Sequence, residues 1–384
     1  MSHPETPPGH VISADALYGE TPAPAAMQDE LLRLVVCPVC GRRFTLEASH
    51  RDDGVVVEGW LRCPCGRSYP ILRGIPRLLE DWPRLYPSLA SPFEPPGAAS
   101  PGEGGRTRDR MGEFKRRTQR QFGFQWTVFH QMSCDFWENF FTSVGPVAPD
   151  FFRGKTGLDA GCGFGRHLIQ AVRCGARMIG MDYSRAIESS HRNTRDTPGI
   201  ALVQADIERM PFQPACFDFA YSIGVLHHLP EPFRGFDALV RQVKPGGAVI
   251  VWCYSDRRRW TIRTLSALRF FTTRLPLHPL RWLSVGLALG EWMLLLLPFR
   301  LLLAGRLKTL LARKWPRLAV YAPYPLQVAC ADWFDRLAAP VRHYLSLDEL
   351  NAWCARTGLR RARITPTGLY GWTLYAERPG DDGH

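Results

Sequence analysis

The chain has 384 residues, 45% of them hydrophobic, and a formal net charge of +12 at pH 7. This length exceeds one ordinary domain and predicts two or three domains with a sizeable core. Residues 257–320 hold thirteen Lys and Arg residues against a single acid, Glu291, so this segment carries the whole excess of positive charge. The balanced remainder argues against a polyanion-binding surface over the whole protein.

The N-terminal residues and the cysteine count indicate the compartment. Residues 1–30 are rich in Pro and Ala and contain no apolar run, so we expect a disordered tail there. The eleven cysteines are an odd number, and no secretory signal precedes them. In a reducing cytoplasm, paired cysteines indicate metal binding more than disulfides. We therefore expect a cytoplasmic protein.

Residues 31–80 form a compact unit with two cysteine pairs. The first pair, Cys37 and Cys40, has the two-residue spacing of a zinc knuckle on a tight turn. The second pair, Cys63 and Cys65, is one residue shorter. The four thiols predict one structural zinc ion, with a metal-free ribbon held by its own core as the alternative.

The run from residue 61 to residue 79 reads LRCPCGRSYPILRGIPRLL, and with the cysteine pairs it resembles the Trm112-like zinc-ribbon family. The chain departs from that family in the short second pair and in Arg73, where the family has Asp. Separate members of the family activate methyltransferase partners. The resemblance therefore implies a non-catalytic module that supports a catalytic domain in the same chain.

After a proline- and glycine-rich linker at residues 81–110, residues 111–256 alternate apolar runs with helical segments behind an N-terminal helical cap. The first apolar run ends at Ala160, and three glycines spaced two apart follow it: Gly161, Gly163 and Gly165. Such a loop lets the backbone approach a ligand closely. Asp182 and Asp206 end the next two runs, and at the carboxyl edge of a parallel sheet an acid such as Asp182 can reach ribose hydroxyls.

In this order and spacing, residues 155–255 resemble the class I S-adenosylmethionine-dependent methyltransferases, most closely the branch that acts on small molecules. The motifs that carry the resemblance read LDAGCGFG, DYS, DIERMPF, FDFAYSIGVLHHL and KPGG. The resemblance implies an α/β fold, with a Rossmann-like, seven-stranded, mostly parallel sheet, the small N-terminal module and a helical insertion. It also implies that S-adenosylmethionine is bound by Asp159, Gly161, Cys162, Gly163, Gly165, Asp182, Tyr183, Asp206, Ile207 and Ser222.

Within that set, Asp159 is expected at the ammonium group, Asp182 at the ribose, and Tyr183 against the adenine face. For Asp182 alone, capping of the following helix is the alternative interpretation. The segment 120–126 resembles a helix that precedes the core in bacterial relatives, and we expect it to cover the cofactor cleft.

Methyl transfer needs the acceptor aligned with the sulfonium, and it needs a base only where the acceptor is protonated. The candidate bases are His227, His228 and His343, each with a packing or surface role as the alternative. The chain has Ser222-Ile223-Gly224-Val225 where enzymes that methylate amide or base nitrogens carry Asn/Asp-Pro-Pro-Tyr/Phe. This difference favours hydroxyl, carbon or amine acceptors on small molecules.

Residues 257–320 form a basic, apolar helical insertion ahead of the C-terminal part of the domain, residues 321–384. Within it, residues 282–305 approach the length of a membrane span, but Glu291, Pro298 and Arg300 interrupt the apolar run. Three interpretations stay open: a lid or dimer interface, helices lying on the inner face of the membrane, and a spanning helix. A lid of this composition would make the acceptor pocket apolar.

We therefore expect an S-adenosylmethionine-dependent methyltransferase that acts on a small, apolar metabolite. The module and the basic segment leave open a second class, a methyltransferase of RNA or translation, although the aliphatic character of the segment argues against nucleic acid. A third class is a non-catalytic scaffold of the same fold. A homo-oligomer is compatible with each of these.

Overall fold

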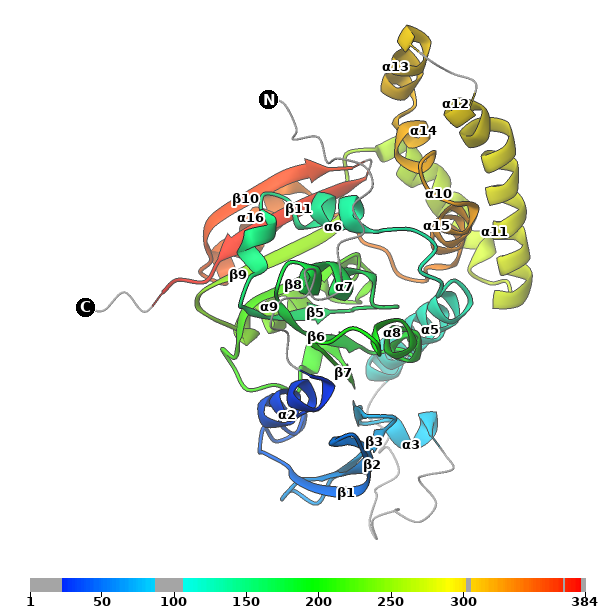
Figure 1. The fold of residues 1–384 in the computed structure, drawn as a ribbon. Coiled ribbons are helices and arrows are strands. Elements are labelled where there is room, and N and C mark those ends of the chain that lie inside the picture. The colour runs from blue at the N-terminus through cyan, green and yellow to red at the C-terminus, as the bar shows by residue number, and fades with distance from the viewer. Residues whose placement is uncertain (1–22, 87–105, 302–304, 369, 381–384) are drawn as a thin grey trace.

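The computed structural model describes residues 23–86, 106–301, 305–368 and 370–380, and its centre is one eleven-stranded β-sheet (Figure 1). In chain order the strands are β1 (Thr45–Asp52), β2 (Val55–Arg62), β3 (Ser68–Leu72), β4 (Ile75–Leu78), β5 (Thr156–Ala160), β6 (Arg177–Asp182), β7 (Ile200–Ala205), β8 (Phe217–Ile223), β9 (Val243–Tyr254), β10 (Arg360–Thr367) and β11 (Gly371–Glu377). Their order across the sheet is β1-β2-β3-β4-β7-β6-β5-β8-β9-β11-β10.

The core of the sheet consists of seven strands, in the order β7-β6-β5-β8-β9-β11-β10. β7, β6, β5, β8 and β9 are parallel neighbours, and β11 lies antiparallel between β9 and β10. Every residue of β5 is buried, as expected for a central strand covered on both faces. The predicted fold class, a seven-stranded and mostly parallel Rossmann-like sheet, is confirmed.

Helices cover both faces of this core. One face carries α6 (Trp137–Val144), the 3-10 turn η1 (Pro149–Phe152), α7 (Arg166–Arg173) and α8 (Ala186–Thr194). The other carries α2 (Pro24–Leu34), α9 (Pro232–Gln242) and α16 (Leu347–Arg356). Aromatic rings anchor both layers: Phe152 packs on Phe219 at 5.3 Å, and Phe236 packs on Trp353 at 5.2 Å. Two short 3-10 turns, η2 (Ile207–Arg209) and η3 (Leu226–His228), follow β7 and β8.

The N-terminal module continues the core sheet. Its strands β1 to β4 pair antiparallel in sequence, and β4 then pairs parallel with β7 through Arg77 with Gln204 and Leu78 with Ala205. Met27 of α2 packs in the same core cluster as Val203 of β7. The module is therefore joined to the core by main-chain hydrogen bonds and by a shared apolar core.

Two expected boundaries are corrected by the structure. The expected tail at residues 1–30 ends earlier, because α2 begins at Pro24 and buries Met27 and Leu31; residues 1–22 lie outside the described residues. The expected linker at 81–110 is helical at both of its ends, where α3 (Trp82–Leu85) and α5 (Arg106–Val128) lie. Residues 87–105 lie outside the described residues.

The insertion is helical, as predicted, and lies at the end of the molecule opposite the N-terminal module (Figure 1). Its elements are α10 (Arg259–Thr272), α11 (Leu277–Glu291), the π-helical turn η4 (Trp292–Leu296), α12 (Leu297–Leu301), α13 (Gly305–Lys314) and α14 (Pro316–Tyr321). α15 (Leu326–Ala338), assigned from sequence to the C-terminal part of the core, packs with it instead. Leu280 of α11 clusters with Phe334 and Leu337 of α15.

Among the described residues, one helix is long and apolar enough to cross a bilayer by length and composition. It is the continuous run Leu277–Leu301, with 25 residues and a mean hydropathy of 1.6. Only 22% of its apolar window is buried within the protein. Long apolar helices also occur in soluble proteins, so this property does not distinguish spanning from surface binding.

Candidate functional site

A cavity of about 1460 Å³ lies at the carboxyl ends of β5, β6, β7 and β8. Ligand sites in open parallel sheets form at this edge because loops leave adjacent strands in opposite directions there. α5 lines one side of the cavity with Lys115, Gln119 and Phe122, as predicted for the helix ahead of the core. α15 and parts of α11 and α14 line the far end, so the insertion contributes to the wall.

The glycine loop forms the floor of the cavity at the end of β5. Gly161, Cys162 and Gly163 line it, and the N–H groups of Gly161 and Cys162 donate to the carbonyl of Met181 at 2.7 and 3.0 Å. Gly161 has φ +98°, and a Cβ atom there would lie 2.3 Å from Cγ2 of Val225. Only glycine fits this close approach, which leaves the loop backbone facing the cavity.

Asp182 connects this loop to the next strand. Its Oδ2 accepts from the N–H of Gly163 at 2.9 Å, and its Oδ1 accepts from the N–H and hydroxyl of Ser184 at 2.8 and 2.7 Å. Burial raises the pKa of Asp182, and these donated hydrogen bonds oppose that rise. The contacts to Ser184 have the form expected of the capping interpretation, and Asp182 also lines the cavity. Both interpretations therefore describe the same side chain.

The third wall comes from the ends of β6 and β7. Tyr183, Asp206 and Ile207 line the cavity, and Lys115 of α5 forms an ion pair with Asp206 at 2.8 Å. Lys115 also pairs with Glu208. Burial works against the charge of Lys115, but the two carboxylates raise its pKa overall. This ion pair holds α5 across the side of the cavity where the adenine was expected.

Three residues of the expected cofactor set do not line the cavity. Asp159 is buried behind the glycine loop, where burial and the charge of Asp182 raise its pKa well above its ordinary value. Gly165 forms the N-cap of α7 and faces Ser190 and Thr194. Ser222 is fully buried and donates to the carbonyl of Ala160 at 2.8 Å, which ties β8 to β5. These residues shape the loop and the sheet from beneath the cavity.

Of the three candidate bases, only His228 lines the cavity. Its Nδ1 lies 2.8 Å from the carbonyl oxygen of Val341, and its Nε2 lies 3.9 Å from Oδ1 of Asp335. Because a carbonyl can only accept, Nδ1 carries the proton and Nε2 holds the lone pair. Burial lowers the pKa of His228 to about 4, so the ring is neutral at pH 7.

His227 and His343 do not lie at the cavity wall. His227 is fully buried between the rings of His228 and Tyr254, and neither of its ring nitrogens has a hydrogen-bond partner within the described ranges. The N–H of His343 donates to the carbonyl of His227, and its buried Nε2 also lacks a partner among the described atoms. A packing role fits both residues better than proton transfer.

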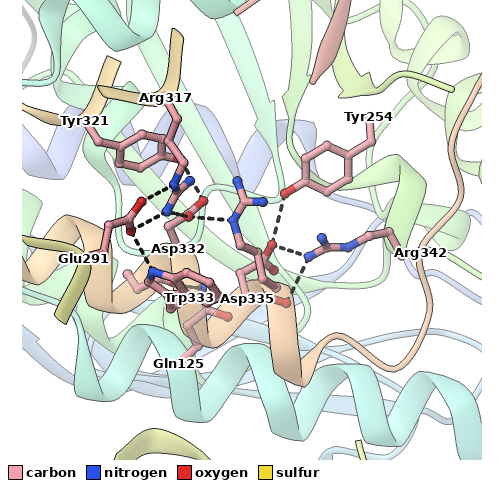
Figure 2. A network of polar contacts seen from close by, with 11 residues as sticks. Gln125, Tyr254, Glu291, Arg317, Tyr321, Asp332, Trp333, Asp335 and Arg342 are labelled. Atoms are coloured by element: carbon pink, nitrogen blue, oxygen red, sulfur yellow. Dashed lines mark hydrogen bonds and ion pairs between the residues drawn. The ribbon is translucent and has the colours of Figure 1, made fainter. Parts of the chain in front are cut away.

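At the far end, a polar network fixes α15 to the insertion and to β9 (Figure 2). Asp332 accepts from Tyr321 at 2.7 Å and pairs with Arg336 at 2.7 Å and with Arg317 at 2.9 Å. Its pKa lies well below its usual range because the two guanidiniums outweigh the effect of burial.

The same figure shows a second carboxylate beside this group. Asp335 accepts from the hydroxyl of Tyr254 at 3.0 Å and pairs with Arg342. Asp332, Asp335, Tyr254 and Tyr321 all line the cavity, so its far end is polar and held in place by ion pairs. The composition of the insertion predicted an apolar acceptor pocket. The far end of the cavity is polar instead, so the pocket is not uniformly apolar.

Arg166, the residue after the third glycine, was missed in the sequence analysis. It lines the cavity, and its guanidinium carbon lies within 5.3 to 5.5 Å of the ring centroids of Trp126, Phe136 and Phe164. Burial lowers its pKa. Its Nε donates to Nε2 of His167 at 3.1 Å, and within the described parts of the chain no carboxylate forms an ion pair with it. A desolvated, unpaired cation beside the glycine loop is a site for an anionic group. Its position at the start of a helix after the loop was the available signal.

The four predicted zinc ligands lie together in the N-terminal module. The sulfur atoms of Cys37, Cys40, Cys63 and Cys65 are all within 4.8 Å of one another. A tetrahedral zinc with Zn–S bonds of about 2.3 Å needs sulfurs roughly 3.8 Å apart, which this cluster can adopt with small adjustments. The shortened second pair still brings both thiols into the cluster, with Cys63 and Cys65 3.2 Å apart.

Comparisons with known proteins agree on the core. Residues 158–251 match a family profile described as "Methyltransferase domain". The chain is 31% identical over 99 residues to a sterol 4-C-methyltransferase of Caenorhabditis elegans, covering 25% of this chain and 30% of that protein. It is 30% identical over 114 residues to a demethylmenaquinone methyltransferase of Clavibacter sepedonicus, covering 29% of this chain and 44% of that protein.

A third relative acts on a different kind of molecule by its name. The chain is 34% identical over 98 residues to a tRNA U34 carboxymethyltransferase of Pseudoalteromonas atlantica, covering 24% of this chain and 30% of that protein. The chain thus spans less than half the length of these curated relatives. A solved methyltransferase of Thermotoga maritima, a possible histamine N-methyltransferase, aligns over 70% of this chain and all of its own, at 13% identity and a TM-score of 0.37.

Proposed function

We propose that this chain, whose residues 158–251 form a methyltransferase domain, transfers a methyl group from S-adenosylmethionine to an oxygen or carbon atom of a small acceptor. The observation that carries the proposal is one cavity lined at one end by Gly161, Asp182 and Asp206 and at the other by Tyr254 and Asp335. Alignment of two ligands in one cavity is the main requirement of an in-line displacement.

The residues present fit the cofactor. When bound, S-adenosylmethionine supplies a methyl group activated by a positively charged sulfur. Asp182 and Asp206 each keep carboxylate lone pairs beyond the hydrogen bonds they already accept, which suits ribose hydroxyls and an adenine amine. Arg166 offers an unpaired guanidinium for the carboxylate of the amino acid part.

His228 is the candidate base at the acceptor end. It is neutral at pH 7, and its Nε2 lone pair is the one not committed to Val341. A hydroxyl or an acidic carbon held beside it would lose its proton to Nε2 as the methyl group is transferred. Asp335 then lies close enough to stabilise the resulting imidazolium.

For the module, we propose a structural zinc and a role as a scaffold, as in the Trm112-like proteins that it resembles. None of the four cysteines lines the cavity, so the zinc would stabilise the ribbon and take no part in the chemistry there. The parallel pairing of β4 with β7 is the path by which the module supports the domain.

The relatives named above support a small, apolar acceptor in two cases and a tRNA in the third. The alternative is a methyltransferase that acts on RNA. The exposed apolar side chains of the insertion argue against it, because RNA binding depends mainly on contacts between cations and phosphates. Turnover of the cofactor would exclude a non-catalytic scaffold.

The direct test is binding of S-adenosylmethionine by calorimetry. Wild type should bind, and Asp182→Ala should lose binding while keeping its fold by circular dichroism. Asp196→Ala is the matched control, because Asp196 is an exposed acid whose ion pair in the described structure is with its neighbour Arg195. A well-folded wild type that produces no binding heat would reject the cofactor assignment.

A further inference from the structure

The insertion exposes an unusual amount of apolar surface. Nineteen large apolar side chains are exposed among the described residues, and all but Val39, Phe114 and Leu347 lie within residues 257–320. The most exposed are Trp260 at 79% and Leu294 at 76%. Isolated exposed apolar residues are normal on soluble proteins, but a concentration in one unit indicates a partner.

The long helix Leu277–Leu301 has two distinct faces. Leu280, Ser284 and Ala288, spaced four residues apart, are buried toward α15 and its neighbours. The outward side is apolar as well and carries Trp282, Leu283, Leu287, Met293, Leu294 and Leu295. The helix therefore already packs on the protein through one face, and no described part of the chain covers the other.

Positive charge accompanies this apolar surface. Of the charged residues in 257–320, thirteen are cations and one is an acid, Glu291. Glu291 faces inward, where its carboxylate accepts from Arg317 at 2.8 Å and from the indole N–H of Trp333 at 2.7 Å (Figure 2). The exposed part of the insertion therefore presents cations without a described acid of its own.

The cations lie directly beside exposed aromatic rings. Four such pairs have cation-to-centroid distances between 3.9 and 5.7 Å: Arg274 with Phe270, Arg281 with Trp282, Lys314 with Trp315, and Arg263 with Trp260. At a membrane surface, aromatic rings and aliphatic side chains enter the headgroup boundary while Lys and Arg meet anionic headgroups. The insertion offers both kinds of side chain from the same helices.

The two other occupants fit less well. In a symmetric dimer the same patch meets itself, which would bring cations of one copy against cations of the other with no exposed acid to pair them. A spanning helix would have to leave α15 and take Glu291 away from Arg317 and Trp333 into hydrocarbon. A helix lying on an anionic surface keeps its inward contacts and its charges in water.

We propose that the exposed apolar and cationic surface of residues 257–320 docks this protein on an anionic membrane, and that the methyl acceptor is a lipid-soluble molecule taken from that membrane. The second half rests on the proposed function. It is supported by Val285 of α11, which lines the cavity, while Trp282 and Leu283 of the same helix are exposed. The same helix thus separates the cavity from the docking surface.

The experiment is flotation of the full chain with vesicles of phosphatidylcholine, with and without phosphatidylglycerol. Wild type should float with the anionic vesicles and lose binding at high salt. Leu294→Asp places a charge at the apolar surface and should weaken binding about tenfold or more. Arg274→Glu should weaken it on anionic vesicles. The matched controls are Leu347→Asp and Arg195→Glu, exposed residues outside the insertion, and both should bind like wild type.

Several results would overturn the docking proposal. These are absence of flotation, equal binding to both vesicles, or a stable dimer by light scattering that Leu294→Asp dissociates without any vesicle binding. Salt-sensitive binding of an RNA oligonucleotide that Leu294→Asp leaves intact, with no flotation, would assign the surface to nucleic acid instead.

Cofactor calorimetry on Leu294→Asp separates the two proposals, because this residue lies outside the cavity wall. Flotation without cofactor binding would leave the docking surface in place and reject the enzyme. Cofactor binding without flotation would support the enzyme and reject the docking surface. If wild type floats and binds cofactor, methyl transfer to acceptors extracted from membranes but not to water-soluble ones supports the second half, and the opposite preference overturns it.

Discussion

Arg77 and Gln204 are paired across the junction between β4 and β7, and Nη1 of Arg77 donates to Oε1 of Gln204 at 3.2 Å. Nε2 of Gln204 donates in turn to the carbonyls of Tyr183 and Ser184 at 3.3 and 3.2 Å. Arg77 is 1% exposed, and its Nη2 pairs with Glu188 of α8 at 2.7 Å. The last strand of the module is therefore two hydrogen bonds from the segment that follows Asp182.

Arg77→Met should destabilise the whole protein and weaken cofactor binding. Removal of the Arg77 guanidinium leaves the half-buried Glu188 with Arg73 at 3.5 Å as its remaining described partner, which costs about 2 kcal/mol in the free energy of unfolding, less than for a fully buried pair. The shifted Gln204 should lower cofactor affinity about tenfold through Tyr183. Urea unfolding and calorimetry measure the two effects. Arg361→Met is the control, because Arg361 pairs with Glu377 on the exposed surface and should cost less than about 1 kcal/mol.

The succession of strands along the chain and the glycine loop could be predicted from the sequence because both depend on local patterns. Apolar runs that alternate with helical segments predict parallel strands. A glycine turn after Ala160 is needed wherever the backbone approaches a ligand closely. The junction at Arg77 could not be predicted, since an arginine in a short strand gives no local sign of burial. The packing of α15 on α11 depends on contacts between segments about 50 residues apart in sequence.

The candidate site divides in the same way. Asp182 and Asp206 were found because acids that end parallel strands share one edge of the sheet. His228 and His227 are neighbours on one short turn, and the sequence alone could not tell which ring faces the cavity and which is enclosed by Tyr254. Arg166 was missed because the role proposed for it depends on its having no ion-paired carboxylate among the described residues, which is a property of the folded surroundings.

Gly161→Ala should impair the cofactor site more than Gly163→Ala. Both glycines have positive φ, so each substitution adds backbone strain of about 1 kcal/mol. At Gly161 the new Cβ would also lie 2.3 Å from Val225, whereas at Gly163 its nearest neighbour is Nε1 of Trp126 at 3.5 Å. We expect Gly161→Ala to abolish measurable cofactor binding and Gly163→Ala to weaken it severalfold. Equal affinities by calorimetry would contradict this order.

Arg166→Met should remove the preference for a ligand with a carboxylate. Loss of a charge-assisted hydrogen bond weakens binding by about 1.5–3 kcal/mol. Wild type should therefore bind S-adenosylhomocysteine more tightly than its decarboxylated analogue, and Arg166→Met should bind both equally. Calorimetry with the two ligands separates this effect from a general loss of the site. A preference that persists in the variant would assign Arg166 to the acceptor instead.

Acidification should destabilise the protein through His228. The folded-state pKa is lowered to about 4, below the ordinary value of 6.5, so the unfolded chain binds the proton first as pH falls. The stability that the neutral ring contributes is complete above pH 6.5 and decreases toward pH 4. Between pH 7 and pH 5 the loss is about 2 kcal/mol.

His228→Gln should reduce that pH dependence, because glutamine does not titrate. Urea unfolding of both proteins at the two pH values gives the difference directly. His50→Gln is the control: His50 is exposed on β1 and its replacement should leave the slope unchanged. Identical slopes in wild type and His228→Gln would show that His228 is not held neutral.

Removal of zinc should destabilise the core as well as the module. Since β4 belongs to the same sheet as β7 and α2 shares an apolar cluster with the core, loosening of the ribbon exposes one side of β7. We expect one zinc per chain by metal analysis and a fall in Tm of roughly 5 °C on chelation, equivalent to about 2 kcal/mol. Cys65→Ser should reproduce the fall, whereas Cys134→Ser, a half-buried cysteine outside the cluster, should not. A metal-free chain with unchanged Tm in Cys65→Ser would instead establish a ribbon held by its apolar core, in which Tyr69 and Leu61 provide the packing that four thiolates were expected to supply.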